Sequence, residues 1–82
     1  MFYVYVLEDV CDESNHYIGM TGNLRNRLES HNSNDNNGYT RGVEWKLLYY
    51  EAYETRSLAY KREQSLKRNG RARQLLYKRL KG

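Results

Sequence analysis

The chain has 82 residues, a net charge of +4 and one cysteine, Cys11. This length predicts a single domain over residues 1–82 with a small core, and a lone cysteine excludes an internal disulfide. No segment approaches the roughly 18 apolar residues that span a membrane, and no basic segment leads into an apolar one at the N-terminus. We therefore expect a cytoplasmic protein that makes no membrane contact.

The first third of the chain predicts two strands and a helix. Residues 2–7 are apolar or aromatic on both alternating faces, which is typical of a central strand covered on both sides. Residues 8–16 are polar and predict a loop. Tyr17 to Met20 predicts a second short strand, antiparallel to the first. Asn23 is a good N-cap for a helix that we expect to end near Asn32.

The remainder of the chain predicts a loop, a strand and two helices. Residues 33–42 are rich in Asn, Ser, Asp and Gly and indicate a loop, and residues 45–53 are apolar enough for a third strand. A second helix is predicted over residues 55–68, and Asn69-Gly70 stops it. Residues 72–80 form a last amphipathic helix. The order ββαβαα predicts an α+β fold, sandwich-like, with a three-stranded antiparallel sheet flanked by helices.

The net charge hides an asymmetry along the chain. From residue 61 onward nine Lys and Arg residues stand against one acidic residue, Glu63, for a balance of +8. Residues 1–60 carry five basic and nine acidic residues, a balance of −4. Such a basic segment is typical of a phosphate-binding surface, although a solvated helix carries the same pattern. Charge alone leaves ribosomal, RNA-binding and DNA-binding proteins open.

The segment from Tyr17 to His31 combines residue types that hold phosphates and move protons. Arg27 and His31 are spaced i, i+4, so they lie on one side of the predicted first helix. Arginine offers a planar fork of donors that matches a phosphate, and histidine titrates near neutral pH. Arg25, two residues before Arg27, is predicted to point elsewhere. From spacing alone, a surface arginine and a structural histidine explain the pattern equally well.

This segment resembles the second half of the motif that names the GIY-YIG nucleases. Tyr17-Ile18-Gly19 matches that half, and Tyr3-Val4-Tyr5 is a degenerate first half with tyrosine in place of glycine. Arg27 follows Tyr17 by ten residues, at the position of the family arginine. His31 falls where the family has a histidine or tyrosine.

Two later segments extend the resemblance over nearly the whole chain. Residues 42–51 resemble the third strand of the small single-domain members, the UPF0213 or YhbQ-like group. Residues 59–67 resemble the family helix that carries the metal-binding glutamate, which is Glu63 here. Four motifs in the right order imply a GIY-YIG endonuclease-like fold and a metal-dependent DNA endonuclease of repair or recombination.

The resemblance implies one cleft lined by five catalytic residues: Tyr5, Tyr17, Arg27, His31 and Glu63. Glu63 would hold a divalent ion, most simply Mg²⁺ with Mn²⁺ as the alternative, because waters and the phosphate complete the coordination. From spacing alone, Glu63 and Lys67 read as an ordinary helix ion pair. Which tyrosine or histidine acts as the base stays open, because a phenol needs nearby positive charge to ionise.

DNA is the expected partner, with no small-molecule cofactor and a monomeric chain. Its phosphates are expected to contact four basic residues: Arg41, Lys67, Arg68 and Arg71. Two alternatives remain at this point. One is a non-catalytic nucleic-acid-binding module that keeps the scaffold, and the other is a protein-interaction domain that uses the aromatic strand from Tyr49 to Tyr53.

Overall fold

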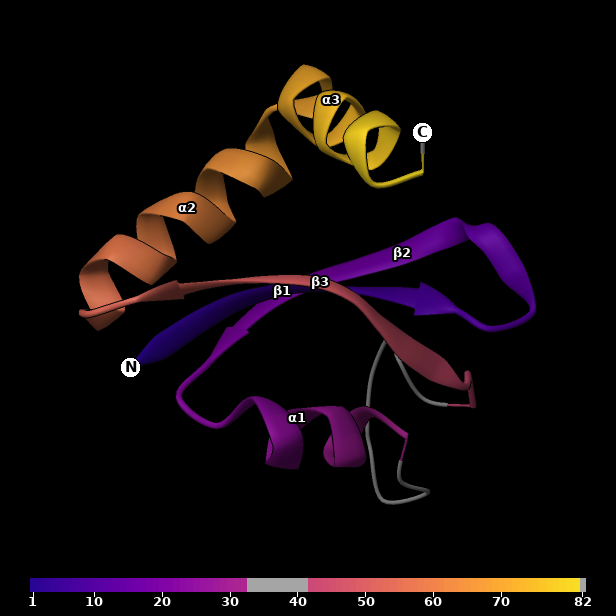
Figure 1. Cartoon of the computed structure of the whole chain (residues 1–82), viewed down its shortest axis with the longest axis horizontal. Coiled ribbons are helices and arrows are strands. Elements are labelled where there is room, and N and C mark those ends of the chain that lie inside the picture. Colours follow the sequence, from indigo (N-terminus) through magenta and orange to yellow (C-terminus); the bar gives the residue numbers. More distant parts are fainter. Residues whose placement is uncertain (33–41, 82) are drawn as a thin grey trace.

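The computed structural model describes residues 1–32 and 42–81 and contains one antiparallel sheet with three helices (Figure 1). The elements are β1 (Phe2–Asp9), β2 (Asp12–Thr21), α1 (Leu24–His31), β3 (Trp45–Tyr53), α2 (Arg56–Arg68) and α3 (Gly70–Lys81). The strand order is β2-β1-β3. The predicted α+β class and the order ββαβαα are confirmed. In the described ranges no helix has the length and apolar character that crossing a membrane requires.

The strand β1 is central, as its two apolar faces predict. Val4 to Glu8 are all buried, and the strand pairs with β2 on one side and β3 on the other. In this register Tyr5 is opposite Gly19 of β2 and Tyr50 of β3. Because paired residues share a face of the sheet, these three positions lie on the same side.

The helices form two layers, one on each face of the sheet (Figure 1). On one face α2 and α3 cover a core that includes Val4, Val6 and Leu66. On the other face α1 packs its two leucines against a second core of Tyr5, Leu7 and Trp45. The faces alternate along β1, so the single strand contributes to both cores.

The predicted loop over residues 8–16 is wrong. Strand β1 continues to Asp9 and β2 begins at Asp12, so only two residues connect them. The polar side chains of β2 up to Ser14 face solvent at the end of the hairpin, which a strand tolerates when one face is uncovered. The polar residues of this segment therefore form the exposed end of a β-hairpin and not an irregular loop.

Glu8, the first residue of that segment, is fully buried, and its carboxylate is surrounded by one histidine and two lysine side chains. Its carboxylate lies 3.1 Å from Nε2 of His16, 3.3 Å from Nζ of Lys46 and 2.7 Å from Nζ of Lys81. These contacts lower the pKa of Glu8, with the hydrogen bond from Lys81 as the main cause. The last turn of α3 is thereby attached to the central strand.

A second carboxylate, Glu51 on β3, gathers side chains on the face that α2 covers. Arg62 donates two hydrogen bonds to it, at 2.9 and 3.0 Å, and the hydroxyls of Tyr49 and Tyr53 donate to it as well. Two of the tyrosines that the interaction-domain alternative requires are therefore engaged inside the molecule. Tyr50, on the opposite face, is 51% exposed.

The junction of α2 and α3 is defined by one asparagine and one arginine. Asn69 ends α2 as predicted, and its side-chain oxygen accepts the backbone N–H of Ala72 in the first turn of α3. Arg73 donates to the carbonyl oxygens of Leu66 and Lys67 at 2.9 and 2.6 Å. These bonds satisfy groups that a helix end leaves without partners, so α3 follows α2 directly.

Candidate active site

The phenol oxygen of Tyr5 is the centre of the candidate site. Its hydroxyl lies 2.8 Å from Nε2 of His31 and accepts a hydrogen bond of 3.4 Å from Nε of Arg27. Burial raises the pKa of Tyr5 to about 12, while the hydrogen bond and charge of Arg27 oppose the increase. The phenol is therefore protonated at neutral pH and is in contact with a group that can take its proton.

His31 ends α1 and is buried against two tyrosine rings. Its ring centroid lies 5.8 Å from that of Tyr5 and 4.8 Å from that of Tyr17. Burial lowers the pKa of His31, and the charge of Arg27 lowers it further. The imidazole is consequently neutral at physiological pH, which leaves one ring nitrogen as a proton acceptor.

Arg27 provides the cation of the cluster, one helical turn before His31. The hydrogen bond to Tyr5 raises the pKa of Arg27 against the effect of burial, and a second hydrogen bond joins it to Tyr17. The residue as a whole is exposed. A guanidinium with one edge on the tyrosines and the rest open to solvent suits an incoming anion.

Gly19 makes room for Tyr5. A β-carbon built on Gly19 would lie 2.7 Å from Cζ of Tyr5 and 3.2 Å from a ring carbon of Tyr17. The ring of Tyr5 therefore leans from the central strand over β2, the edge strand, and only glycine leaves the space that this requires. The close approach at Gly19 is therefore made by a tyrosine side chain.

The position of α1 above the sheet is fixed at both of its ends. Asn23 accepts the backbone N–H of Asn26 at 3.1 Å, which is the predicted N-cap. At the other end the side chain of Asn32 forms two hydrogen bonds with the backbone of Trp45, at 2.7 and 2.9 Å. Arg27 and His31 thus sit on a short helix whose two ends are held.

Glu63 comes from a different layer of the molecule than the other four residues. Its helix α2 covers the opposite face of the sheet from α1 (Figure 1). The carboxylate accepts a hydrogen bond from Gln64 at 3.2 Å and lies 3.5 Å from Nζ of Lys67. One cleft lined by all five residues therefore stays a prediction for Glu63.

The charge of Glu63 nevertheless acts on the tyrosine cluster, since it contributes to the raised pKa of Tyr5. Helix α2 packs on β1 and on the edge strand β2, and Tyr5 leans over Gly19 on that same strand. The two parts of the site therefore meet across the β2 edge. Within residues 1–32 and 42–81, no group of three His, Cys, Asp or Glu side chains is arranged to hold a metal ion.

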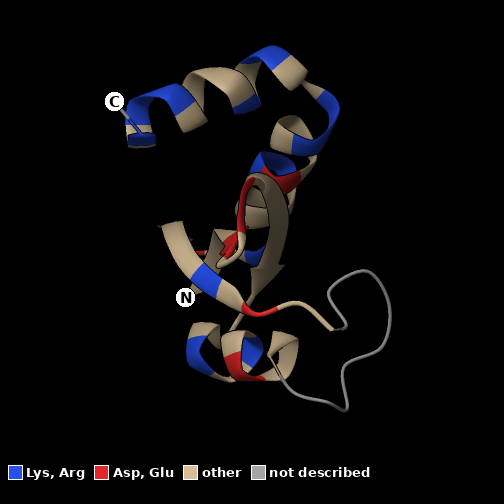
Figure 2. Ribbon diagram, turned by 90° about the vertical axis from the view of Figure 1, so that its right-hand side faces the viewer, with Lys and Arg blue, Asp and Glu red and all other residues tan. Residues whose placement is uncertain are grey.

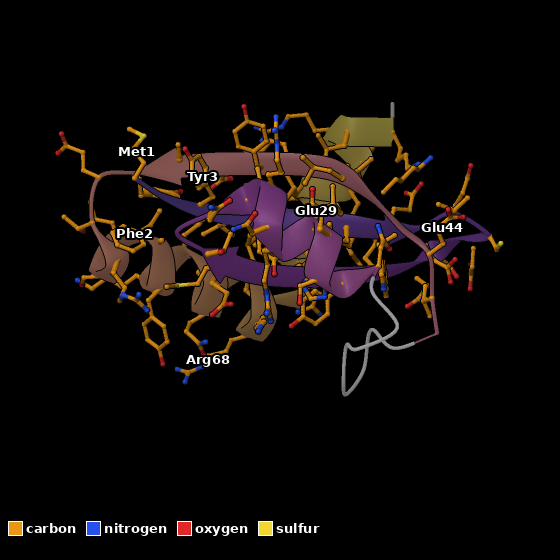
Figure 3. The ribbon with its side chains drawn as sticks, turned by 90° about the horizontal axis from the view of Figure 1, so that it is seen from below. Met1, Phe2, Tyr3, Glu29, Glu44 and Arg68 are labelled. Carbon is orange, nitrogen blue, oxygen red and sulfur yellow. The ribbon has the colours of Figure 1, made fainter. Side chains whose placement is uncertain are left out.

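The proposed nucleic-acid contacts divide into three cases. Arg41 lies outside the described residues. Lys67 is paired with Glu63, whereas Arg68 and Arg71 are exposed at the junction of α2 and α3. Lys and Arg residues gather along these two helices (Figure 2), and Arg68 projects at the end of α2 when the molecule is viewed from the α1 side (Figure 3). The junction is thus one open part of the basic segment.

Several cations of this segment are already used inside the fold. Arg62 binds Glu51, Arg73 holds the end of α2 and Lys81 binds Glu8. The balance of +8 therefore overstates the charge that is available to a ligand. The sequence does not reveal this, because two of the three partners lie on strands and not on the helices that carry these cations.

The two half-motifs face each other across one strand pair. In the ladder between β1 and β2, Tyr5 is opposite Gly19 and Leu7 is opposite Tyr17. The GIY-YIG catalytic domain family matches residues 1–79. The chain belongs to the GIY-YIG family. This confirms the resemblance inferred from the motifs and makes the chain a nuclease-family protein.

Three UPF0213 proteins illustrate how similar the GIY-YIG relatives are. One from Clostridium perfringens is 38% identical over 76 residues, covering 92% of this chain and 80% of the relative. One from Halobacterium salinarum is 36% identical over 73 residues, covering 88% and 92%. One from Haloquadratum walsbyi is 36% identical over 66 residues, covering 79% and 72%. No solved structure gives a significant match.

Reasoning from the sequence missed two residues that position this GIY-YIG site. Trp45 was predicted only as the start of a strand, yet its ring lies 6.2 Å from that of Tyr17 and belongs to the same core. Asn32, which binds the Trp45 backbone, was predicted only as a helix end. A lone large aromatic residue at a strand start was the available signal for Trp45.

Proposed function

We propose that this chain is a metal-dependent endonuclease that hydrolyses phosphodiester bonds in DNA. The observation that carries the proposal is the contact of one oxygen atom, the Tyr5 hydroxyl, with both Nε2 of His31 and Nε of Arg27. A proton acceptor and a cation therefore meet at a single point. Phosphodiester hydrolysis needs both, since a water must lose a proton while negative charge builds on the phosphate.

In the proposed mechanism Tyr5 and His31 share the role of base. The raised pKa of Tyr5, about 12, makes the phenol alone a poor base at neutral pH. Because Arg27 donates to the phenol oxygen, the phenol proton is directed to Nε2 of His31 in the tautomer that is protonated on Nδ1. A water gives its proton to Tyr5 as Tyr5 gives its own to His31, and the resulting hydroxide attacks phosphorus. The bond between phosphorus and the leaving ester oxygen breaks in the same displacement, and that oxygen takes a proton from solvent water.

Arg27 holds the phosphate in this mechanism. Its guanidinium is exposed beyond its contacts with the two tyrosines, so the remaining N–H groups donate to the non-bridging oxygens. These charge-assisted hydrogen bonds strengthen as charge develops in the transition state.

Glu63 fits the role of a single protein ligand to Mg²⁺, with Mn²⁺ as the alternative. Carboxylate oxygens are the donors that such a hard cation prefers, and Mg²⁺ retains several waters when it binds. A bound ion would supply charge stabilisation to the phosphate and the leaving oxygen. The Glu63 side chain is 11% exposed and is covered by Lys67. Movement of Lys67 to a DNA phosphate would free this carboxylate.

The second candidate function is a nucleic-acid-binding module without catalysis. Two observations favour it: Glu63 lies on the other layer from Arg27, and Lys67 already neutralises its carboxylate. On this alternative the tyrosine cluster is a packing unit, and the basic junction of α2 and α3 does the binding.

Nicking of a supercoiled plasmid with Mg²⁺, with Mn²⁺ and with EDTA distinguishes the two functions. Glu63→Ala is expected to abolish metal-dependent cleavage and to keep DNA affinity in EDTA, because the partner of Glu63 is the metal. The matched control is Glu54→Ala, an exposed acidic residue. If Glu63→Ala cleaves as well as the parent, the chain is not a nuclease of this kind.

Arg27→Ala tests the phosphate contact in the same assay. Loss of one preorganised donor is expected to lower the cleavage rate by about 10²–10³-fold, and no metal concentration should restore it. Asn26→Ala, the exposed neighbour on α1, is expected to cleave normally. A parent protein that binds DNA and cleaves it with neither metal would support the binding module instead.

A further inference from the structure

A cavity of about 340 Å³ lies beside the candidate active site, on the face of the sheet that α1 covers. Its lining comes from the sheet and from the start of α1: Tyr3, Gly22, Asn23, Leu24, Arg25 and Tyr50. In the view from the α1 side, Tyr3 lies next to the N-terminal end of that helix (Figure 3). The cavity is shallow and largely open to solvent.

Two tyrosine rings form an aromatic corner in this cavity. The rings of Tyr3 and Tyr50 are 5.9 Å apart between centroids and meet at 69°, edge to face. Tyr50 is 51% exposed, although it belongs to a strand. An exposed ring supported from one side by a second ring is a ready surface for a planar group.

The opposite wall is polar and carries a positive charge. Arg25 is exposed on the first turn of α1 and lines this cavity, whereas Arg27 contacts the tyrosine cluster. The side-chain oxygen of Asn23 is engaged in capping the helix, so its amide nitrogen is the group left to donate. Aromatic faces, a cation and an amide donor together suit a nucleobase rather than an aliphatic ligand.

The cavity is next to the cluster around Tyr5 along the same two strands. Tyr3 precedes Tyr5 by two residues on β1 and faces the same side, and Tyr50 is the residue that pairs with Tyr5 on β3. Two residues along a strand span about 7 Å. A nucleotide chain whose phosphate binds at Arg27 could therefore reach the cavity with an adjacent base.

We infer that this cavity binds one unpaired nucleobase of a DNA strand whose phosphate lies at Tyr5 and Arg27. The base stacks on the exposed ring of Tyr50, with Tyr3 behind it and Arg25 at the rim. A base inside a duplex is stacked and paired and cannot enter, so the cavity selects single-stranded DNA or an unpaired end. This inference rests on the proposed function only for the position of the phosphate.

Binding measurements in EDTA separate this inference from catalysis. We would titrate a short fluorescein-labelled oligothymidylate and, separately, a labelled blunt-ended duplex without a loop. Tyr50→Ala is expected to weaken single-strand binding by about 5- to 100-fold, the usual effect of removing one stacking partner, and to leave duplex binding unchanged. Tyr50→Phe, which keeps the ring, should bind like the parent.

The matched control is Tyr60→Ala. Tyr60 is 53% exposed, almost the same as Tyr50, but it lies on α2 in the other layer. Its removal should change neither affinity. Thermal melting of each variant checks that the fold is intact, and Tyr50 is exposed enough for its truncation to be tolerated.

An oligonucleotide with abasic sites in place of its bases gives the decisive comparison. The parent should lose affinity for it, and Tyr50→Ala should then cause no additional loss, because ring and base act through one contact. The inference is overturned if Tyr50→Ala binds single strands like the parent, or if it weakens single-strand and duplex binding equally. If the protein cleaves DNA and neither cleavage nor binding depends on Tyr50, the proposed nuclease activity stands and the proposed nucleobase site is wrong. If single-strand binding depends on Tyr50 but no DNA is cleaved, the nucleobase site stands and the nuclease activity is wrong.

Discussion

The ring of Tyr5 lies over Gly19 so closely that a β-carbon on residue 19 would fall 2.7 Å from Cζ of Tyr5. Gly19→Ala must therefore displace a buried ring, which is expected to lower the free energy of unfolding by about 1–3 kcal/mol. The same displacement separates the phenol from His31 and should slow cleavage by about 10²-fold.

Thermal melting and plasmid nicking check both effects, with Gly22→Ala as the control. A β-carbon on Gly22 would lie 3.6 Å from Phe2, an ordinary van der Waals distance. Stability and cleavage should both be close to those of the parent. Equal behaviour of the two variants would mean that the Tyr5 ring moves freely.

The pH dependence of cleavage should show the proposed proton transfer. His31 accepts a proton only when neutral, and its lowered pKa extends the neutral form to pH values below the ordinary value of about 6.5. The rate should therefore be level at neutral pH and fall only in more acidic solution, as the pH drops through the lowered pKa.

Removing the histidine tests this assignment. His31→Gln is expected to cleave about 10²-fold more slowly and to lose the acidic fall in rate, because general base catalysis typically contributes that much. His16→Gln changes the second histidine, which contacts Glu8, and should leave the profile in place. An acidic fall that persists in His31→Gln would point to a different titrating group.

The junction of α2 and α3 should account for part of the salt dependence of DNA binding. Arg68→Ala combined with Arg71→Ala is expected to flatten the log–log slope by up to about 1.8 on duplex DNA, or about 0.9 for each phosphate that is no longer neutralised. Lys78→Ala combined with Arg79→Ala removes the same charge near the other end of α3. If this second pair of substitutions flattens the slope equally, DNA contacts the whole length of α3 and not mainly the junction of α2 and α3.

Glu8 should make the fold sensitive to acid. Its pKa is lower in the folded chain than in the unfolded one, so its contribution to stability is present above the unfolded pKa and disappears as the pH falls through the folded pKa. Glu8→Gln is expected to cost about 2 kcal/mol at pH 7 and to reduce the loss of stability on acidification. Urea unfolding from pH 3 to 7 measures this, with exposed Glu44→Gln as the control.

Local pattern was sufficient where neighbouring residues decide the structure. The central strand followed from apolar residues on both faces of residues 2–7, and Asn23 marked the start of α1 through its own cap. Both features depend on contacts that a strand or one helical turn makes possible. The grouping of Tyr5, Tyr17, Arg27 and His31 followed instead from the resemblance to the GIY-YIG family, because its hydrogen bonds join residues 26 and 22 positions apart.

Features that depend on distant partners were not predictable. The sequence predicts a polar loop at Glu8, because nothing near it in the chain indicates a buried partner. That partner is Lys81, which is 73 residues away. Helical periodicity places Glu63 on a side of α2 but does not say which face of the sheet α2 covers. The layer that carries Glu63 is decided by the path of the chain across the sheet, and no short motif encodes it.

The central position of β1 has a consequence for how the protein folds. The first strand of the chain can pair early with β2 through the two-residue turn, but its other edge stays open until β3 arrives from beyond residue 44. During that interval an apolar strand exposes unpaired backbone groups, which is the arrangement that promotes pairing between molecules. The yield of refolding should therefore fall as protein concentration rises, even though the completed sheet buries that edge.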